Sequence, residues 1–385
     1  MTAQKVAVDA GAHNRSGCPV SVWLPWDYRE FKGALLTDET TRRELPGQLR
    51  RSGKGVTLSW ISPTLKAGER RRFTVVPLPQ PADAPGVTVV NDAEAFRADV
   101  WIKGVLFTTY HYSKQWVRPF LHPVIGPRGA RVTRNWPIEI DAPGETRDHP
   151  HHKSLWVAHG ACNNVDHWSE EGKHGWQRHR SFTRETSGPV FGQLTANIDW
   201  CTHAGRKQFE EVRDMCFYAL PGGDRLFDVS VMFRMTEGKV TFYDTKEGGL
   251  LSIRVATSMD VTNGGCIENA YGGINETETW GKPSPWCDYS GVVDGHDVGV
   301  AVFDYETNPR YPTQWHVRDY GLMAANCFAW NDYRPEAKVK GDMVFEKGAK
   351  RAWRYRVLVH KGNAARGKVR ERFLDFVAPP TVTVE

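Results

Sequence analysis

The chain has 385 residues, 40% of them hydrophobic and 25% charged, and a formal net charge of +5. This composition is that of an ordinary globular protein with one or two cores. The basic residues form no dense stripe, which argues against a nucleic-acid partner, and no window of about 18 apolar residues is present, which argues against a membrane span.

The seven cysteines include no C-x-x-C spacing. This pattern predicts free thiols in a reducing compartment rather than a disulfide framework. The first residues contain no apolar segment of the kind found in secretory signals. We therefore expect a cytoplasmic protein that makes no contact with a membrane.

The first 87 residues predict short strands separated by turns. Residues 55–61 and 72–76 are rich in β-branched and aromatic side chains, as strands are. The proline-rich run over residues 77–85 is typical of a linker. We predict a small N-terminal β-domain over residues 1–87 and a main domain over residues 88–385.

The main domain is rich in strand signals, and helical periodicity is nearly absent from it. Its only helical pattern covers residues 364–376, where we expect a C-terminal helix. Many strands with few helices indicate an all-β fold, a large antiparallel β-sandwich. The candidate strands cover residues 98–103, 105–112, 193–200, 211–220, 225–235, 240–243, 250–256, 298–303 and 352–360.

Histidines are concentrated in one stretch of the main domain. Seven of the 14 histidines lie between Arg147 and His179, and histidine is suited to proton transfer and metal ligation. If residues 153–158 form a strand, His152 and His159 lie roughly 23 Å apart and cannot share one metal. We therefore expect one compact group, His149, His151 and His152, and a looser group that begins at His159.

The compact group has three interpretations. In the first, His149, His151 or His152 is a general acid or base acting on a sugar. In the second, two of these histidines and a carboxylate bind a divalent metal that polarises the substrate. In the third, the histidines and Asp148 only hold loop backbones. The first interpretation requires no cofactor.

Lys246 and Glu247 lie between two predicted strands. The pair can be a tuned acid–base pair, with Glu247 as a second proton-transfer group, or a solvated turn. Arg254 follows on an apolar strand, where an unpaired charge is costly. We expect this arginine to hold Glu247 or a substrate oxygen.

Residues 315–320 have the alternation of a strand with one polar face. His316, Arg318 and Tyr320 point to the same side, as every second residue of a strand does. They predict a wall that binds sugar hydroxyls, whereas an Arg318–Asp pair with Tyr320 as a core cap is the structural alternative. We also expect Trp286, in a loop over residues 285–291, to stack on the ligand and His159 to contact it.

Several segments in order resemble those of the PmoA-like bacterial proteins of unknown function. They are residues 118–129 (RPFLHPVIGPRG), 147–152 (RDHPHH), 155–160 (LWVAHG), 244–248 (DTKEG), 254–256 (RVA), 285–291 (PWCDYSG), 308–312 (NPRYP) and 315–321 (WHVRDYG), with Asn326. The resemblance covers about residues 97–365 and implies a β-supersandwich like that of galactose mutarotase. The fold occurs in sugar epimerases, lyases and hydrolase domains, and genes of such proteins lie near sugar oxidoreductases.

The resemblance implies an enzyme of carbohydrate catabolism that acts on a sugar or glycoside. The reaction is glycoside cleavage, by hydrolysis or by elimination on an oxidised sugar, or epimerisation. Elimination next to a keto group suits a base combined with an electrophile. Two alternatives remain, a sugar-binding protein that works with an oxidoreductase without catalysis, and a metal-dependent lyase or hydrolase.

Overall fold

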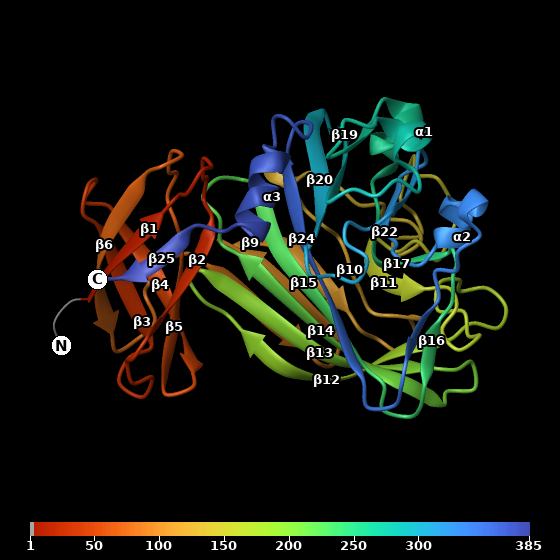
Figure 1. Ribbon diagram of the computed structural model, residues 1–385, viewed down its shortest axis with the longest axis horizontal. Coiled ribbons are helices and arrows are strands. Elements are labelled where there is room, and N and C mark those ends of the chain that lie inside the picture. The colour runs from red at the N-terminus through yellow and green to blue at the C-terminus, as the bar shows by residue number, and fades with distance from the viewer. Residues whose placement is uncertain (1–3) are drawn as a thin grey trace.

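The computed structural model describes residues 4–385, which form an elongated, nearly all-β molecule (Figure 1). Hydrogen bonds assign the strands to three large sheets and one two-stranded ribbon, and all the strand pairs are antiparallel. The predicted all-β class is confirmed. Within residues 4–385, no helix is long and apolar enough to cross a membrane.

The N-terminal part forms one seven-stranded sheet around its own core of Val8, Leu36, Leu58, Trp60 and Phe73. The end strands of this sheet contact each other, so that it curls. Its last strand comes from the chain's C-terminus, which the division at residue 87 assigned to the main domain. The strand order is β2 (Pro19–Leu24), β5 (Gly55–Ile61), β4 (Glu44–Ser52), β3 (Gly33–Asp38), β6 (Arg70–Leu78), β1 (Gln4–Asp9) and β25 (Thr381–Val384).

Two eight-stranded sheets form the rest of the molecule. The first, called here the site sheet, has the order β21 (Trp315–Arg318), β22 (Leu322–Ala325), β17 (Gly248–Arg254), β11 (Leu155–His159), β10 (Phe120–Leu121), β9 (Val105–His111), β8 (Arg97–Ile102) and β7 (Val87–Asp92). The second has the order β12 (Trp176–Thr186), β13 (Phe191–Cys201), β14 (Lys207–Tyr218), β15 (Arg225–Arg234), β24 (Lys350–Lys361), β20 (His296–Asp304), β19 (Trp286–Val293) and β18 (Cys266–Asn269). The ribbon pairs β16 (Val240–Phe242) with β23 (Met343–Phe345).

The main hydrophobic core lies between these two sheets. Phe107 and Leu251 enter it from the site sheet, and Phe217 and Phe227 enter it from the second sheet. The apolar residues of each strand alternate in direction, as a strand with one face in a core requires. The site sheet therefore keeps a second face, turned away from the core, for other uses.

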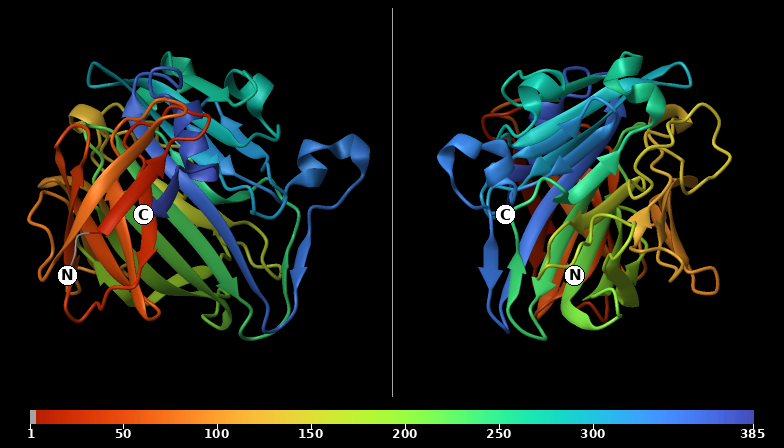
Figure 2. Two further views of the ribbon diagram at one scale, coloured as in Figure 1. Left: turned by 60° about the vertical axis from the view of Figure 1, so that its left-hand side comes forward. Right: turned by 90° about the vertical axis from the view of Figure 1, so that its right-hand side faces the viewer.

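Helices are short and peripheral. The predicted C-terminal helix is present as α3 (Val369–Val377), which begins five residues later than expected because residues 364–368 form a turn with Lys368 at a positive φ. The helix α1 (Asn275–Thr279) lies beside β21. The helix α2 (Trp330–Tyr333) begins the loop that leads to β23. The segment that carries α2 projects from the body of the molecule (Figure 2).

Candidate active site

The polar face predicted for residues 315–320 exists on the site sheet. Trp315 and Val317 of β21 point into the core, whereas His316 and Arg318 point outward. Tyr320, just after the strand, packs on the same outer face beside Trp156 and Trp168. The outer face therefore brings β21 together with the histidine stretch of the sequence.

Asp148 is the centre of the charged groups on this face. Its Oδ1 atom accepts hydrogen bonds from Nη1 of Arg134 at 2.5 Å and from Nη2 of Arg254 at 2.8 Å. Both arginine side chains are fully buried, while that of Asp148 is 37% exposed. Burial raises the pKa of Asp148, but the His149 hydrogen bond and the charges of Arg254 and Arg134 lower it far more, so that the carboxyl is ionised.

His149 is held by the same carboxylate and faces solvent. Its Nδ1 atom donates to Oδ2 of Asp148 at 2.9 Å, and its side chain is 39% exposed. This hydrogen bond places the proton on Nδ1 and leaves the lone pair of Nε2 free, the arrangement of a base oriented by a carboxylate. The backbone of His149 has φ 46°, a strained value of the kind that clusters at functional sites.

His152 is held in the opposite tautomer. Nη1 of Arg254 donates to Nδ1 of His152 at 3.2 Å, so that this ring carries its proton on Nε2. Burial, with His151 and Arg254 nearby, holds the pKa of His152 well below its usual value, and the ring stays neutral. The rings of His149 and His152 stack at 4.8 Å with 8° between their planes.

Aromatic rings surround the two imidazoles. Tyr320 stacks on His149 at 4.8 Å, and Trp156 stacks on His152 at 5.3 Å. His151 lies edge-on to His152 at 4.5 Å, and burial lowers the pKa of His151 to about 3. Three buried polar atoms of this cluster have no partner within residues 4–385: Nδ1 of His151, Nε1 of Trp156 and Nε1 of Trp168. Buried polar atoms are normally hydrogen-bonded, so these are places for a water or a ligand oxygen.

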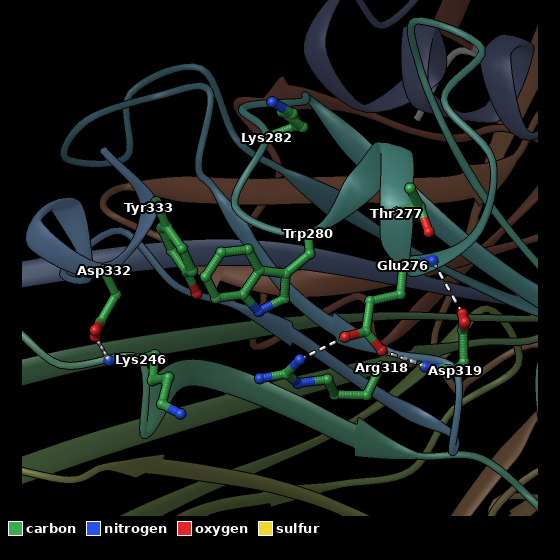
Figure 3. A pocket seen from close by; sticks show the side chains of 9 residues that line it. All are labelled: Lys246, Glu276, Thr277, Trp280, Lys282, Arg318, Asp319, Asp332 and Tyr333. Atoms are coloured by element: carbon green, nitrogen blue, oxygen red, sulfur yellow. Dashed lines mark hydrogen bonds and ion pairs between the residues drawn. The ribbon is translucent and has the colours of Figure 1, made fainter. Parts of the chain in front are cut away.

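A cavity of about 780 Å³ is lined by Arg318, Trp280 and Tyr333 among others, and no histidine of the cluster lines it (Figure 3). The indole of Trp280 lies between Tyr333 and the ion pair that Arg318 forms with Glu276 (Figure 3). Trp280 and Tyr333 meet edge to face at 4.9 Å, and both carry a buried polar atom without a partner in the described chain. The volume is that of a site for a molecule of drug size, and aromatic walls with a few polar groups suit a sugar.

His316 links the cavity to the histidine cluster. Its Nδ1 atom is bonded to the carbonyl oxygen of Lys246, and its Nε2 atom accepts from Nε of Arg318 at 3.3 Å. Its ring is parallel to that of Trp168 at 6.5 Å. Burial lowers the pKa of His316 to about 3, so that the ring is a neutral wall and does not transfer protons near neutral pH.

Lys246 and Glu247 lie between β16 and β17, as predicted, and Lys246 lines the cavity. Their side chains are 42% and 50% exposed, and Nζ of Lys246 is 3.6 Å from Oε1 of Glu247. The expectation that Arg254 holds Glu247 was wrong, because Arg254 is turned towards Asp148 and His152. Burial raises the pKa of Tyr320 to about 12, and the negative charge of Glu247 contributes to this rise.

His159 and Trp286, both expected to contact the ligand, lie elsewhere. The ring of His159 is buried between Phe242 and Phe328, and its Nε2 atom is bonded to the carbonyl oxygen of Tyr243. Trp286 begins β19, where a loop was expected, and packs under α3 with Phe303. Both predictions are corrected, since neither side chain reaches the cavity or the histidine cluster.

Metal ligation has no support in the geometry of the described residues. Within residues 4–385, no three His, Cys, Asp or Glu side chains are grouped in a way that could hold a metal ion. The Nδ1 atoms of His149 and His152 are occupied by Asp148 and Arg254. In the observed arrangement, His149 and His152 are stacked imidazoles that are hydrogen-bonded to Asp148 and Arg254 respectively.

Several residues of this site were not selected from the sequence. Trp280, Glu276 and Tyr333 lie on or beside short helices that have no periodic pattern. Arg134 lies in a loop that has no strand or helix pattern. The available signal for Asp148 was its place directly before His149 in the histidine-rich stretch.

The fold and this arrangement define a two-sheet antiparallel β-sandwich protein with a histidine-lined polar face. The chain belongs to a family of unknown function, DUF6807, whose model matches residues 97–373. The match does not bear on the resemblance to PmoA-like proteins, which stays a prediction. No curated protein is detectably similar in sequence.

Among solved structures, the chain is similar to an α-mannosidase from Enterococcus faecalis V583. The TM-score is 0.45 and the sequence identity is 8%, over 100% of this chain and 46% of the mannosidase chain. The chain thus spans less than half of that enzyme. A likeness of this degree has no bearing on the chemistry of the site.

Proposed function

We propose that the chain is a carbohydrate-acting enzyme in which His149 and His152 form a proton-transfer pair. The observation that carries the proposal is the pair's opposite tautomers, fixed by Asp148 on one ring and Arg254 on the other. One Nε2 atom is then a proton acceptor and the other is an N–H donor, on rings 4.8 Å apart. A base next to a neutral donor suits the removal of a proton from a carbon beside a carbonyl group.

The chemistry follows from these two atoms. Nε2 of His149 takes the proton, the C–H electron pair moves towards the carbonyl, and the resulting oxyanion accepts the N–H of His152. The intermediate then either expels an oxygen substituent on the neighbouring carbon or regains a proton on its other face. The first outcome is cleavage by elimination, and the second is epimerisation.

Hydrolysis has less support from the geometry. A usual glycoside hydrolase has two carboxyl groups that flank the scissile bond. Asp148 is already committed to two buried arginines and to His149. We keep Glu247, beside Lys246, as the second proton-transfer group, which exchanges a proton with the departing oxygen. We assign Lys246, Arg318 and Tyr320 to binding hydroxyl groups.

A sugar-binding role without catalysis is the second candidate. The aromatic wall of Trp280 and Tyr333 favours it, because such a wall binds a sugar ring whether or not chemistry follows. The protein would then present a bound sugar to a partner oxidoreductase. It predicts binding in titration calorimetry without any product after long incubation.

The test is a product screen by mass spectrometry on native and 3-keto glycosides, in ordinary water and in deuterium oxide. Elimination predicts an unsaturated sugar product that is one water lighter than the hydrolysis product, and epimerisation predicts deuterium on carbon. His149→Gln should abolish the product, whereas His203→Gln, a change in an exposed turn, should not. A cleavage product that contains the added water, or full activity in His149→Gln, would overturn the assignment.

A further inference from the structure

Buried cations outnumber their partners around the imidazoles. Four cationic side chains lie there. Those of Arg118, Arg134 and Arg254 are fully buried, and that of Lys153 is 5% exposed. Among residues 4–385, two carboxylates form ion pairs with these four side chains. Glu170 pairs with Arg118 and Lys153, and Asp148 pairs with the other two.

The other acidic residues nearby do not restore the balance by direct pairing. Asp166 accepts hydrogen bonds from the backbone of Trp168 and Ser169, and Glu145 accepts them from Asn135 and Trp136. Asp260 is buried near Arg254 without an ion pair, and burial raises its pKa to about 7. At neutral pH, Asp260 is therefore only partly charged.

The imidazoles experience this excess as a positive field. After burial, the charges that most lower the pKa of His151 include Arg118 and Lys153, and those at His152 include Arg254 and Arg134. Buried cations without a full counter-charge are costly. A ligand that brings negative charge to this face lowers that cost.

Cations also line the route from the imidazoles to the cavity. The positive charge of Arg318 lowers the pKa of Tyr320, the residue whose ring stacks on His149. Lys246 and Lys282 line the same cavity, and Lys282 forms no ion pair with any described residue. Glu276, Asp319 and Asp332 line this cavity as well, so the unpaired positive charge that attracts a negative group lies mainly beside the histidines.

We propose that the ligand of this site is a sugar acid, a uronate or an aldonate. Its carboxylate would lie between the His149–Tyr320 stack and Arg318, and its remaining carbons and hydroxyls would extend into the cavity along Trp280. The inference rests on the proposed function, because it names the substrate class of the same site. A neutral glycoside would bring no negative charge to balance these buried cations.

Titration calorimetry on the full chain tests this proposal with matched pairs. The probes are D-glucuronate against D-glucose, D-galacturonate against D-galactose, and acetate as a bare anion. We expect at least one acid to bind about tenfold or more tightly than its neutral counterpart, and added salt to weaken that binding, since exposed charges are screened. Equal affinities within both pairs, or acetate binding as tightly as the best acid, would overturn the inference.

A charge variant locates the effect at the mouth. Lys246→Gln should weaken binding of the acid several-fold more than that of the neutral sugar, for which it loses only a contact to hydroxyl groups. Lys350→Gln, which removes the same charge from an exposed position on β24, should change neither. An equal loss in both variants would point to net charge alone and contradict the site.

The failures of the two proposals are distinguishable. If sugar acids bind tightly, and neither the glycosides nor the sugar acids give a product when both are screened, the enzymatic function is contradicted and the ligand class is upheld. Turnover of neutral 3-keto glycosides without preferential binding of sugar acids would contradict the ligand class and uphold the enzyme.

Discussion

The two faces of the site sheet have the same strands and opposite compositions. Facing the core, β11, β17, β21 and β22 carry side chains such as Val157, Ile253, Val317 and Met323. Facing outward, the same strands carry Trp156, Arg254, His316 and Ala324. Neighbouring residues of one strand thus belong to the fold on one side and to the site on the other.

The difference lies in how each face is completed. The inner face is closed by a second sheet and depends only on apolar shape. The outer face is closed by loops from distant parts of the chain, which bring Asp148, Trp168 and Glu276 to it. A change on the inner face should therefore affect stability alone, whereas a change on the outer face should affect the chemistry.

The largest effect is expected from Asp148→Asn, which should lower both the activity and the stability of the protein. Loss of the carboxylate removes the tautomer control of His149, and comparable changes lower kcat by up to about 10⁴-fold. It also leaves Arg134 and Arg254 buried without an ion pair, which costs about 3 kcal/mol, the lower end for such pairs because Asp148 is 37% exposed. Turnover on the substrate found in the screen and urea denaturation measure the two losses.

Asp148→Glu is the control for this prediction, since it keeps the charge and alters the geometry. It should recover most of the unfolding free energy and little of the activity. A variant Asp148→Asn with full kcat would remove His149 from the role of base.

Ile253→Ala, on the inner face next to Arg254, separates fold from chemistry. Ile253 is fully buried in the main core, and truncation of such a side chain lowers the free energy of unfolding by about 2–5 kcal/mol. We expect kcat of the remaining folded protein to stay within about twofold of the original. Ser252→Ala, its neighbour on the outer face, should cost about 1 kcal/mol or less. A loss of kcat in Ile253→Ala larger than that in His152→Gln would show that the two faces are not separable.

The sequence predicts the arrangement where polar and apolar side chains alternate along a strand. The alternation in residues 315–320 identified His316, Arg318 and Tyr320 correctly as one side, and the compact group of His149, His151 and His152 is observed. Alternation carries no such information for β11, whose residues are buried on both faces, so that His159 was misplaced.

A local sequence pattern does not predict contacts between side chains from distant segments of the chain. Arg254 fixes the tautomer of His152 and holds Asp148, the partner of His149, through hydrogen bonds that each span more than 100 residues of chain. Trp286 was assigned to a loop because Pro285 and Gly291 flank it, but pairing with β20 makes it a strand residue under α3. Tertiary pairing overrides turn signals in such a segment.

The smallest effect is expected from Asp260→Asn, which tests whether the charge behind the outer face is as unbalanced as inferred. Burial raises the folded pKa of Asp260 to about 7, above its ordinary value in the unfolded chain. Below that ordinary value the carboxyl is protonated in both states, and its full contribution to stability is present. As the pH rises, the unfolded chain releases the proton first, and the contribution is lost by about pH 7.

Asp260→Asn lacks this titration, so its stability relative to the original protein should rise between about pH 4 and pH 7, by about 1–2 kcal/mol after relaxation around the ionised group. Asp304, whose pKa burial also raises to about 7, is present in both proteins and cancels from the difference. Urea denaturation of both proteins at several pH values measures this difference in the free energy of unfolding. Parallel stability curves would mean that Asp260 is ionised in the folded protein, and Arg254 would then have two carboxylates and the outer face less positive charge.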